Sequence, residues 1–224
     1  MAGKRSYGDP CGIARALDVV GERWALLVVR ELVLGPQRFT DLKAHLPGIA
    51  TDVLTQRLRQ LEVAGVLRPV ALTPPASGRA YALTDRGRDL EPVLHALGRW
   101  GSQEGLASAR HEMTVDAFGV ALATVFDPER SHGLDAELAL VVDGDALVAD
   151  VHDGVLQLRR GRAEQPHARI EGSVAALREV LWRGRPLTEA EADGSVTVGG
   201  LRSVARRFVQ LFPAPLRRGS DQPG

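Results

Sequence analysis

Residues 38–64 read RFTDLKAHLPGIATDVLTQRLRQLEVA, and this stretch decides how the first half of the chain is interpreted. Thr40 can cap a short helix over residues 41–46, which a Pro-Gly pair then ends. A longer helix is expected over residues 51–64, stopped by Gly65, because glycine suits the left-handed position after a helix. Two helices joined by the four residues PGIA predict a helix-turn-helix.

The longer helix has two different faces when its residues are spaced at about 100°. Leu54, Leu58 and Leu61 share one face, which must pack on other helices. Gln and Arg can bond two atoms of a base edge, and Thr can contact phosphate or a thymine methyl. Recognition helices present such residues from their N-terminal turns. The polar face and its flanks carry Thr51, Asp52, Thr55, Gln56, Arg57 and Arg59. An ordinary solvated helix face remains the alternative.

The flanking sequence completes a winged helix-turn-helix. Helical periodicity begins after Pro10 and returns over residues 24–34. Residues 66–72 and 80–84 are β-like and enclose a Pro/Gly-rich loop, and residues 85–100 are again helical. We expect base contacts from Thr55, Gln56 and Arg59, and phosphate contacts from Arg38, Thr40, Arg57 and Arg79. Arg79 could instead reach the minor groove or be a solvated hairpin arginine, and Thr40 could serve only as a cap.

The second half of the chain changes character. An apolar helix is expected over residues 114–126, followed by short strands over 138–142, 146–151, 155–159 and 168–171. Helices over 174–183 and 201–212 flank a strand-like segment at 196–198. The sequence therefore predicts a mainly α winged helix-turn-helix domain at residues 1–104. A smaller α+β domain follows at residues 105–224, with an antiparallel sheet covered by helices. The expected linker is 101–110.

The charge of the chain is balanced overall but not evenly distributed. The 224 residues include 28 Lys/Arg and 28 Asp/Glu, so the formal net charge is zero. Residues 1–104 hold 14 basic and 11 acidic side chains, and residues 105–224 hold 14 and 17. The first half is thus mildly positive, which is compatible with nucleic-acid binding through a few placed arginines.

Several classes of protein are disfavoured by the same sequence. The six histidines are scattered without metal-ligand spacing, and we find no nucleophile elbow, P-loop or dinucleotide motif. We therefore expect no enzyme, no metal and no cofactor. One cysteine cannot form an internal disulfide. No apolar run approaches the roughly 20 residues of a membrane helix, and the start MAGKRSYGDPCG lacks a secretory apolar stretch. We expect a cytoplasmic protein that does not enter membranes.

The run from Cys11 to Trp100 closely resembles the HxlR-type winged-helix transcriptional regulators. The pieces GERWALLVVREL, RFTDL, LTQRLRQLE and ALTDRG stand in register. This resemblance implies a MarR-like fold, binding to palindromic promoter DNA, and a homodimer formed by the N-terminal helix and the helix at 85–100. Ala50 stands where the family commonly has a capping serine, and Asp52 where a basic or neutral residue is frequent.

Cys11 lies at the start of the first expected helix, where the helix dipole can favour a thiolate. Some HxlR-type relatives sense oxidants or electrophiles with a cysteine at this position, which implies a redox role. The alternative is a structural thiol near the dimer interface.

The segments VADVHDGVLQLRRG, ARIEGSVAALREVLWRGRP and SVTVGGLRSVARRFVQLFP resemble the sterol-carrier-protein type 2 fold. The resemblance implies an apolar ligand sheltered between sheet and helices. The expected wall residues are Phe118, Leu122, Val151, Leu156, Trp182, Phe208 and Phe212, with plain core packing as the alternative.

These features together predict a homodimeric DNA-binding transcriptional regulator, with repression as the expected sign and an apolar small molecule as effector. A competing hypothesis is an apolar-ligand carrier or accessory protein that uses the winged helix only for dimerisation. A purely structural dimer is the third.

Overall fold

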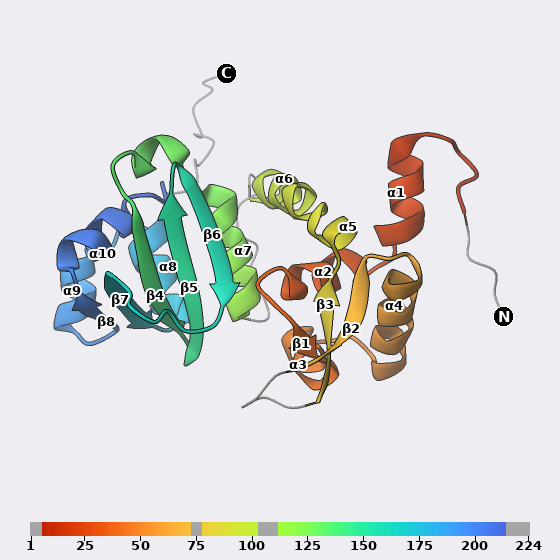
Figure 1. The fold of residues 1–224 in the computed structure, drawn as a ribbon, viewed down its shortest axis with the longest axis horizontal. Coiled ribbons are helices and arrows are strands. Elements are labelled where there is room, and N and C mark those ends of the chain that lie inside the picture. Colours follow the sequence, from red (N-terminus) through yellow and green to blue (C-terminus); the bar gives the residue numbers. More distant parts are fainter. Residues whose placement is uncertain (1–5, 73–77, 103–111, 214–224) are drawn as a thin grey trace, which may run out of the picture. The chain divides into compact units, whose positions relative to one another are not determined.

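The computed structural model describes residues 6–72, 78–102 and 112–213. It divides into two compact units, residues 1–94 and 95–224, each described separately below (Figure 1). The division falls inside helix α6 (Glu91–Gly101), before the expected boundary at 104/105. Most of the expected linker, 101–110, lies outside the described residues. Within the described ranges, no helix combines the length and apolar character needed to cross a bilayer.

The first unit contains the helices expected from the sequence. They are α1 (Gly12–Val20), α2 (Ala25–Leu32), α3 (Phe39–His45), α4 (Thr51–Val63) and α5 (Asp85–Arg88), followed by the start of α6. The single helix expected over 85–100 is wrong, because α5 and α6 are separate. Pro92 explains the break, since it has no N–H to continue a helical ladder and is tolerated only in a first turn.

A small three-stranded sheet forms the wing of this unit. Strands β2 (Leu67–Ala71) and β3 (Arg79–Leu83) pair antiparallel, with Leu67 opposite Leu83. A two-residue strand that the sequence did not indicate, β1 (Gln37–Arg38), pairs with the other edge of β3. The expected loop between β2 and β3 falls largely on residues 73–77, which lie outside the described residues. The hairpin places Arg79 in the wing.

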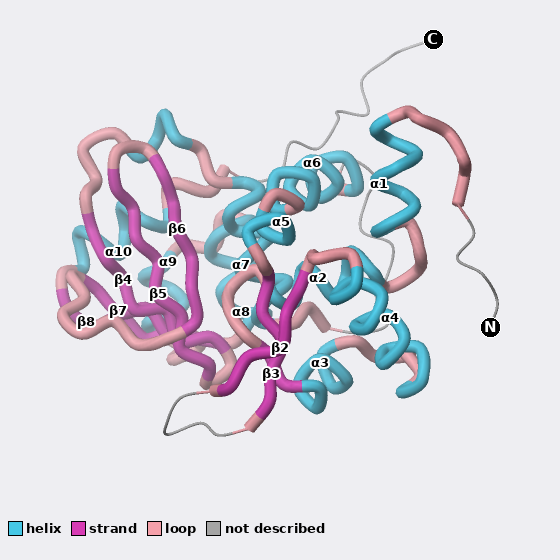
Figure 2. Tube along the Cα trace, turned by 45° about the vertical axis from the view of Figure 1, so that its right-hand side comes forward, coloured by secondary structure: helices cyan, strands magenta, loops and turns pink. Residues whose placement is uncertain are grey.

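The second unit has a five-stranded sheet in the order β6-β5-β4-β7-β8 (Figure 2). The strands are β4 (Ala136–Val142), β5 (Asp145–His152), β6 (Val155–Arg160), β7 (Ala168–Gly172) and β8 (Val196–Gly200). The expectation of an antiparallel sheet is wrong, because β4 and β7 pair in parallel and the sheet is mixed. Asp-Gly turns join β4 to β5 and β5 to β6, whereas residues 161–167 cross back to bring β7 beside β4.

Helices cover one face of this sheet. They are α7 (Val115–Val125), α8 (Val174–Trp182), α9 (Leu187–Ala192) and α10 (Arg202–Val209), with a 3₁₀ turn at Pro128–Ser131. The sequence did not indicate α9 or the 3₁₀ turn. Leu140 and Ile170 of the sheet meet side chains from all four helices around a common apolar core. Within this unit, Phe118 and Trp182 lie with ring centroids 5.4 Å apart.

Candidate nucleic-acid interface

Helix α4 is held by its apolar face and by its C-terminal turn. Leu54, Leu58 and Leu61 are buried, which fixes the rotation of the helix about its axis. At the end of the helix Gly65 has φ +70°, and its N–H donates to the carbonyl of Glu62 (2.9 Å). The N–H of Val66 donates to the carbonyl of Leu61 (2.9 Å), which completes a Schellman motif. The expected stop at Gly65 is confirmed.

Most of the expected base-reading side chains lie on the solvent side of α4. Thr51, Asp52, Thr55, Gln56 and Arg59 are exposed, opposite the buried leucines. The Thr55 hydroxyl donates to the carbonyl of Thr51 (2.8 Å), so its methyl group is oriented by the helix itself. Asp52 occupies the first turn, where a carboxylate interacts favourably with the helix dipole. The arrangement offers donors and a methyl group to a groove.

Arg57 differs from its neighbours on α4. Its residue exposure is only 7%, and its guanidinium bonds to the side-chain oxygen of Gln60 and lies 3.6 Å from a carboxylate oxygen of Glu22. The sequence expectation of a phosphate contact does not fit this placement. Arginine can bury its aliphatic stem on a helix flank, and here the charged end is then engaged inside the unit. The Arg57 side chain therefore links α4 to Glu22.

The start of α3 brings Arg38 and Thr40 together. The helix begins at Phe39, and the Arg38 N–H donates to Asp41 Oδ2 (3.2 Å). The exposed Thr40 hydroxyl donates to Asp41 Oδ1 (3.2 Å). The cap expected from Thr40 is therefore wrong: Thr40 lies within the first turn, and Asp41 bonds back to the helix start. Arg38 and Thr40 nevertheless occupy a helix N-terminus, where phosphate binding is favourable.

Arg79 begins strand β3 and is exposed, opposite Ala71 in the wing hairpin. Thr84, which follows β3, joins the wing to the end of α4. Its hydroxyl donates to the carbonyl of Gly65 (2.6 Å) and accepts from the N–H of Gly87 (3.1 Å). The wing, the end of α4 and α5 are thereby connected by hydrogen bonds.

A buried carboxylate that the sequence reasoning missed connects α2 and α3. Glu31 is fully buried and forms an ion pair with Arg30. A second carboxylate oxygen of Glu31 lies 3.5 Å from His45 Nδ1 at the end of α3. Helical spacing was the available signal, because Glu31 lies three residues after Val28 and so shares the buried face of α2.

The expected ligand wall of the second unit is mostly closed. Phe118, Leu122, Val151, Phe208 and Phe212 are buried, while Leu156 and Trp182 are half-buried. The cavity between the sheet and the helices touches Phe118 and Phe208 and measures about 10 Å³. This is room for roughly one water-sized group. The described side chains thus form a packed core, and an apolar ligand would require the helices to move.

Cys11 precedes α1 and is exposed. Its N–H donates to Asp9 Oδ1 (2.8 Å). The thiol is accessible in the chain as described, which leaves the predicted redox role untested.

A recognition helix between a short helix and a β-wing defines the winged helix-turn-helix class of DNA-binding proteins. A family model described as HxlR-like helix-turn-helix matches residues 19–108. Another, described as alkyl sulfatase C-terminal, matches residues 103–217. The chain therefore belongs to the HxlR-like helix-turn-helix family of transcriptional regulators, and its second half to the alkyl sulfatase C-terminal family. The sterol-carrier resemblance is not confirmed by this match.

Two relatives found by sequence agree with the first assignment. The helix-turn-helix-type transcriptional regulator YvaP of Bacillus subtilis is 35% identical over 89 residues, which is 40% of this chain and 82% of the relative. The corresponding regulator sll1512 of Synechocystis is 40% identical over 95 residues, 42% of this chain and 70% of the relative. Among solved structures, the redox regulator HypR in its oxidized form is 29% identical. The match covers 43% of this chain and 100% of the HypR chain, with a TM-score of 0.40. The two relatives found by sequence are named as transcriptional regulators rather than enzymes.

Proposed function

We propose that this protein is a homodimeric repressor that binds palindromic promoter DNA through α4. The observation that carries the proposal is the polar face of α4, which is exposed along its first turns and rigidly mounted on three buried leucines. Two such helices, one per protomer, enter successive major grooves about one helical turn apart.

The DNA sequence is recognised by Thr55, Gln56 and Arg59. Arg59 bonds two acceptors of a guanine edge, Gln56 reads adenine, and Thr55 offers a methyl group to thymine. Asp52 accepts from a cytosine amino group or simply favours the helix N-terminus. Thr51 lies on the flank of the same face.

Phosphate contacts fix the register of the unit on the duplex. Arg38 and Thr40 at the start of α3 and Arg79 in the wing supply them. Arg57, with its guanidinium engaged by Gln60 and Glu22, has no part in this set.

Two exposed apolar stripes support dimerisation. Ile13 and Leu17 on α1 are 73% and 43% exposed, and Val93, Leu97 and Trp100 of α6 are also exposed. Large apolar side chains at helical spacing are stabilised when another chain covers them. A homodimer formed through α1 and α6 covers both.

The second unit holds or transmits the effector signal in this proposal. Its match to the C-terminal part of alkyl sulfatases supports a role separate from DNA reading. An apolar effector that enters between the sheet and the helices would shift them and change the spacing of the two recognition helices. The closed core weighs against a constitutive carrier of apolar ligands.

Oxidation of Cys11 provides a second regulatory signal in this proposal. Oxidation at its exposed thiol can form only an adduct or an intermolecular disulfide, because the chain has one cysteine. Diamide should lower the DNA affinity of the wild type and leave Cys11→Ser unchanged; equal affinities for both proteins would remove Cys11 from the proposal.

The DNA-binding proposal is tested by fluorescence anisotropy on the duplex upstream of the protein's own coding sequence. Arg59→Ala should weaken specific binding by about 10-fold to 150-fold, the loss of one bidentate base contact. Arg183→Ala, an exposed arginine of the second unit, removes the same charge and should leave affinity unchanged. Equal affinities of wild type and Arg59→Ala would contradict the assigned mechanism.

A further inference from the structure

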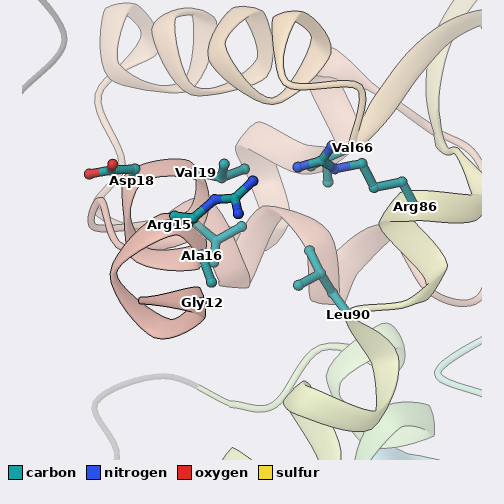
Figure 3. A pocket seen from close by; sticks show the side chains of 9 residues that line it. Gly12, Arg15, Ala16, Asp18, Val19, Val66, Arg86 and Leu90 are labelled. Atoms are coloured by element: carbon teal, nitrogen blue, oxygen red, sulfur yellow. The ribbon is translucent and has the colours of Figure 1, made fainter. Parts of the chain in front are cut away.

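A pocket of about 490 Å³ opens in the first unit between α1, the segment after α4, and α5. Its wall is apolar where Ala16 and Val19 of α1 face Val66 and Leu90 (Figure 3). This volume lies within the usual range of small-molecule sites. The residues come from distant parts of the sequence, which is why periodicity did not reveal the pocket.

Two guanidinium groups converge on this pocket. Arg15 reaches it from α1 and Arg86 from α5, and their charged ends point toward the same space (Figure 3). Neither arginine has an ion pair or hydrogen bond to another residue of the described chain. Both arginines are exposed, so solvent screens much of their mutual repulsion, and an anion bound between them would interact favourably with both charges.

The acidic residue on the pocket wall does not supply that anion. Asp18 accepts hydrogen bonds from the Ser6 hydroxyl (2.7 Å) and the Tyr7 N–H (2.9 Å). Its carboxylate points away from Arg15 and Arg86 (Figure 3). Both positive charges therefore remain available to a ligand.

We propose that this pocket binds a small organic carboxylate with an apolar body. The carboxylate lies between Arg15 and Arg86, because guanidinium groups bond planar carboxylates bidentately. The body, of the size of one aromatic ring, covers Val19, Val66 and Leu90. An inorganic anion would leave the apolar wall in water, and a neutral apolar molecule would leave the two arginines unneutralised.

The position of the pocket gives this ligand a route to the DNA-binding surface. Val66 follows the last turn of α4 directly, and its carbonyl accepts from the N–H of Thr84 (3.1 Å). On α1, the exposed Ile13 and Leu17 lie roughly 120° around the helix from the pocket side, so a partner protomer and the ligand can both contact α1. This regulatory consequence rests on the proposed function, whereas binding of the carboxylate does not.

Isothermal titration calorimetry on the full chain tests the binding itself. Benzoate is the probe, benzamide is its neutral isostere, and sodium sulfate tests for a purely electrostatic site. Benzoate should bind at least about tenfold more tightly than benzamide or sulfate, since only it satisfies both halves of the pocket. Equal affinities for benzoate and sulfate, or for benzoate and benzamide, would overturn the proposal.

Variants identify the site. Arg15→Gln and Arg86→Gln should each weaken benzoate binding about tenfold, and Val19→Phe should abolish it by filling the space. Arg88→Gln, an exposed arginine of α5 that does not line the pocket, is the matched control and should bind normally. An equal loss in Arg88→Gln, or no benzoate binding to the wild type, would show that the pocket is not a carboxylate site.

A measurement of DNA binding distinguishes this proposal from the proposed function. Benzoate should change the operator affinity of the wild type and not of Arg86→Gln. If calorimetry shows binding while operator affinity is absent or constant, the carboxylate site stands and the regulatory mechanism fails.

Discussion

The arginines of the two units are used differently. In the second unit most of those described pair with carboxylates: Arg130 with Asp127, Arg159 with Glu137, Arg160 with Asp116 and Asp145, Arg169 with Glu171, Arg183 with Glu179, Arg185 with Asp193, and Arg202 with Glu191. In the first unit Arg15, Arg59, Arg68, Arg79, Arg86 and Arg88 have no ion pair to another described residue. The zero net charge therefore combines a unit in which most described arginines pair with carboxylates and a unit in which these six arginines are exposed to solvent.

The largest effect should follow from breaking a pair in the second unit. Asp116 is fully buried, and Arg160 bonds both of its carboxylate oxygens at 2.9 and 2.7 Å. Burial lowers the pKa of Arg160, but the hydrogen bonds and charges of Asp116 and Asp145 outweigh burial and hold this pKa above its ordinary value. Arg160→Met removes two hydrogen bonds and the nearby positive charge from a buried carboxylate and should cost about 3–5 kcal/mol of unfolding free energy.

Urea denaturation followed by circular dichroism measures this loss. Arg159→Met, on the same strand, removes an exposed guanidinium 3.5 Å from Glu137 and should cost less than about 1 kcal/mol. Similar losses for the two variants would mean that pairing in the second unit does not depend on burial, and the contrast between the units would weaken.

An intermediate effect is expected for the unpaired cations of the first unit. Arg79→Ala should weaken DNA binding about equally on specific and unrelated duplexes and reduce the salt slope by about 1, as expected for one lost phosphate contact. Arg169→Ala removes a paired arginine of the second unit and should leave the slope unchanged. Anisotropy titrations at several salt concentrations measure both; a lower slope in Arg169→Ala alone would reverse the assignment of the two units.

The smallest effect concerns an exposed histidine of the second unit. The Asp135 carboxylate accepts a hydrogen bond from His152 Nδ1 (3.0 Å). This bond and the negative charges of Asp135 and Asp153 raise the pKa of His152 above 6.5. Because the folded-state pKa is raised, the stabilisation is fully present below about pH 6.5 and is lost as the pH rises through the folded value. Asp135→Asn should lower the pKa of His152, as followed by NMR titration of its ring protons. An unchanged pKa in Asp135→Asn would assign the shift to other charges.

Local signals predicted the first unit well. Gly65 ended α4, the leucines at positions 54, 58 and 61 fixed its buried face, and the β-like segments formed the wing. The expected Thr40 cap was wrong and the break at Pro92 was missed although their causes are local, whereas the other failures depended on distant partners. Nothing local indicates that Gln37–Arg38 pairs with β3, that Arg57 meets Glu22, or that Arg15 and Arg86 share a pocket.

The second unit was harder for the same physical reason. Asp-Gly turns predicted the hairpins, since a two-residue turn sets the register of its own strands. The parallel pairing of β7 with β4 cannot be predicted in this way, because no turn joins the two strands directly. Their pairing depends instead on the face that both strands share beneath the helices. The expected ligand-wall residues are buried or half-buried, but periodicity cannot distinguish a lined chamber from a filled core.

The parallel pairing of β4 with β7 also affects the order in which the two units fold. In the wing, β3 closes on β2 across a short loop, whereas β7 can join β4 only after the two intervening strands have been synthesised. Closing that longer loop slows folding, and domains fold in order as they leave the ribosome. We therefore expect the first unit, with the exposed apolar side chains of α1, to be folded while the second sheet is still incomplete.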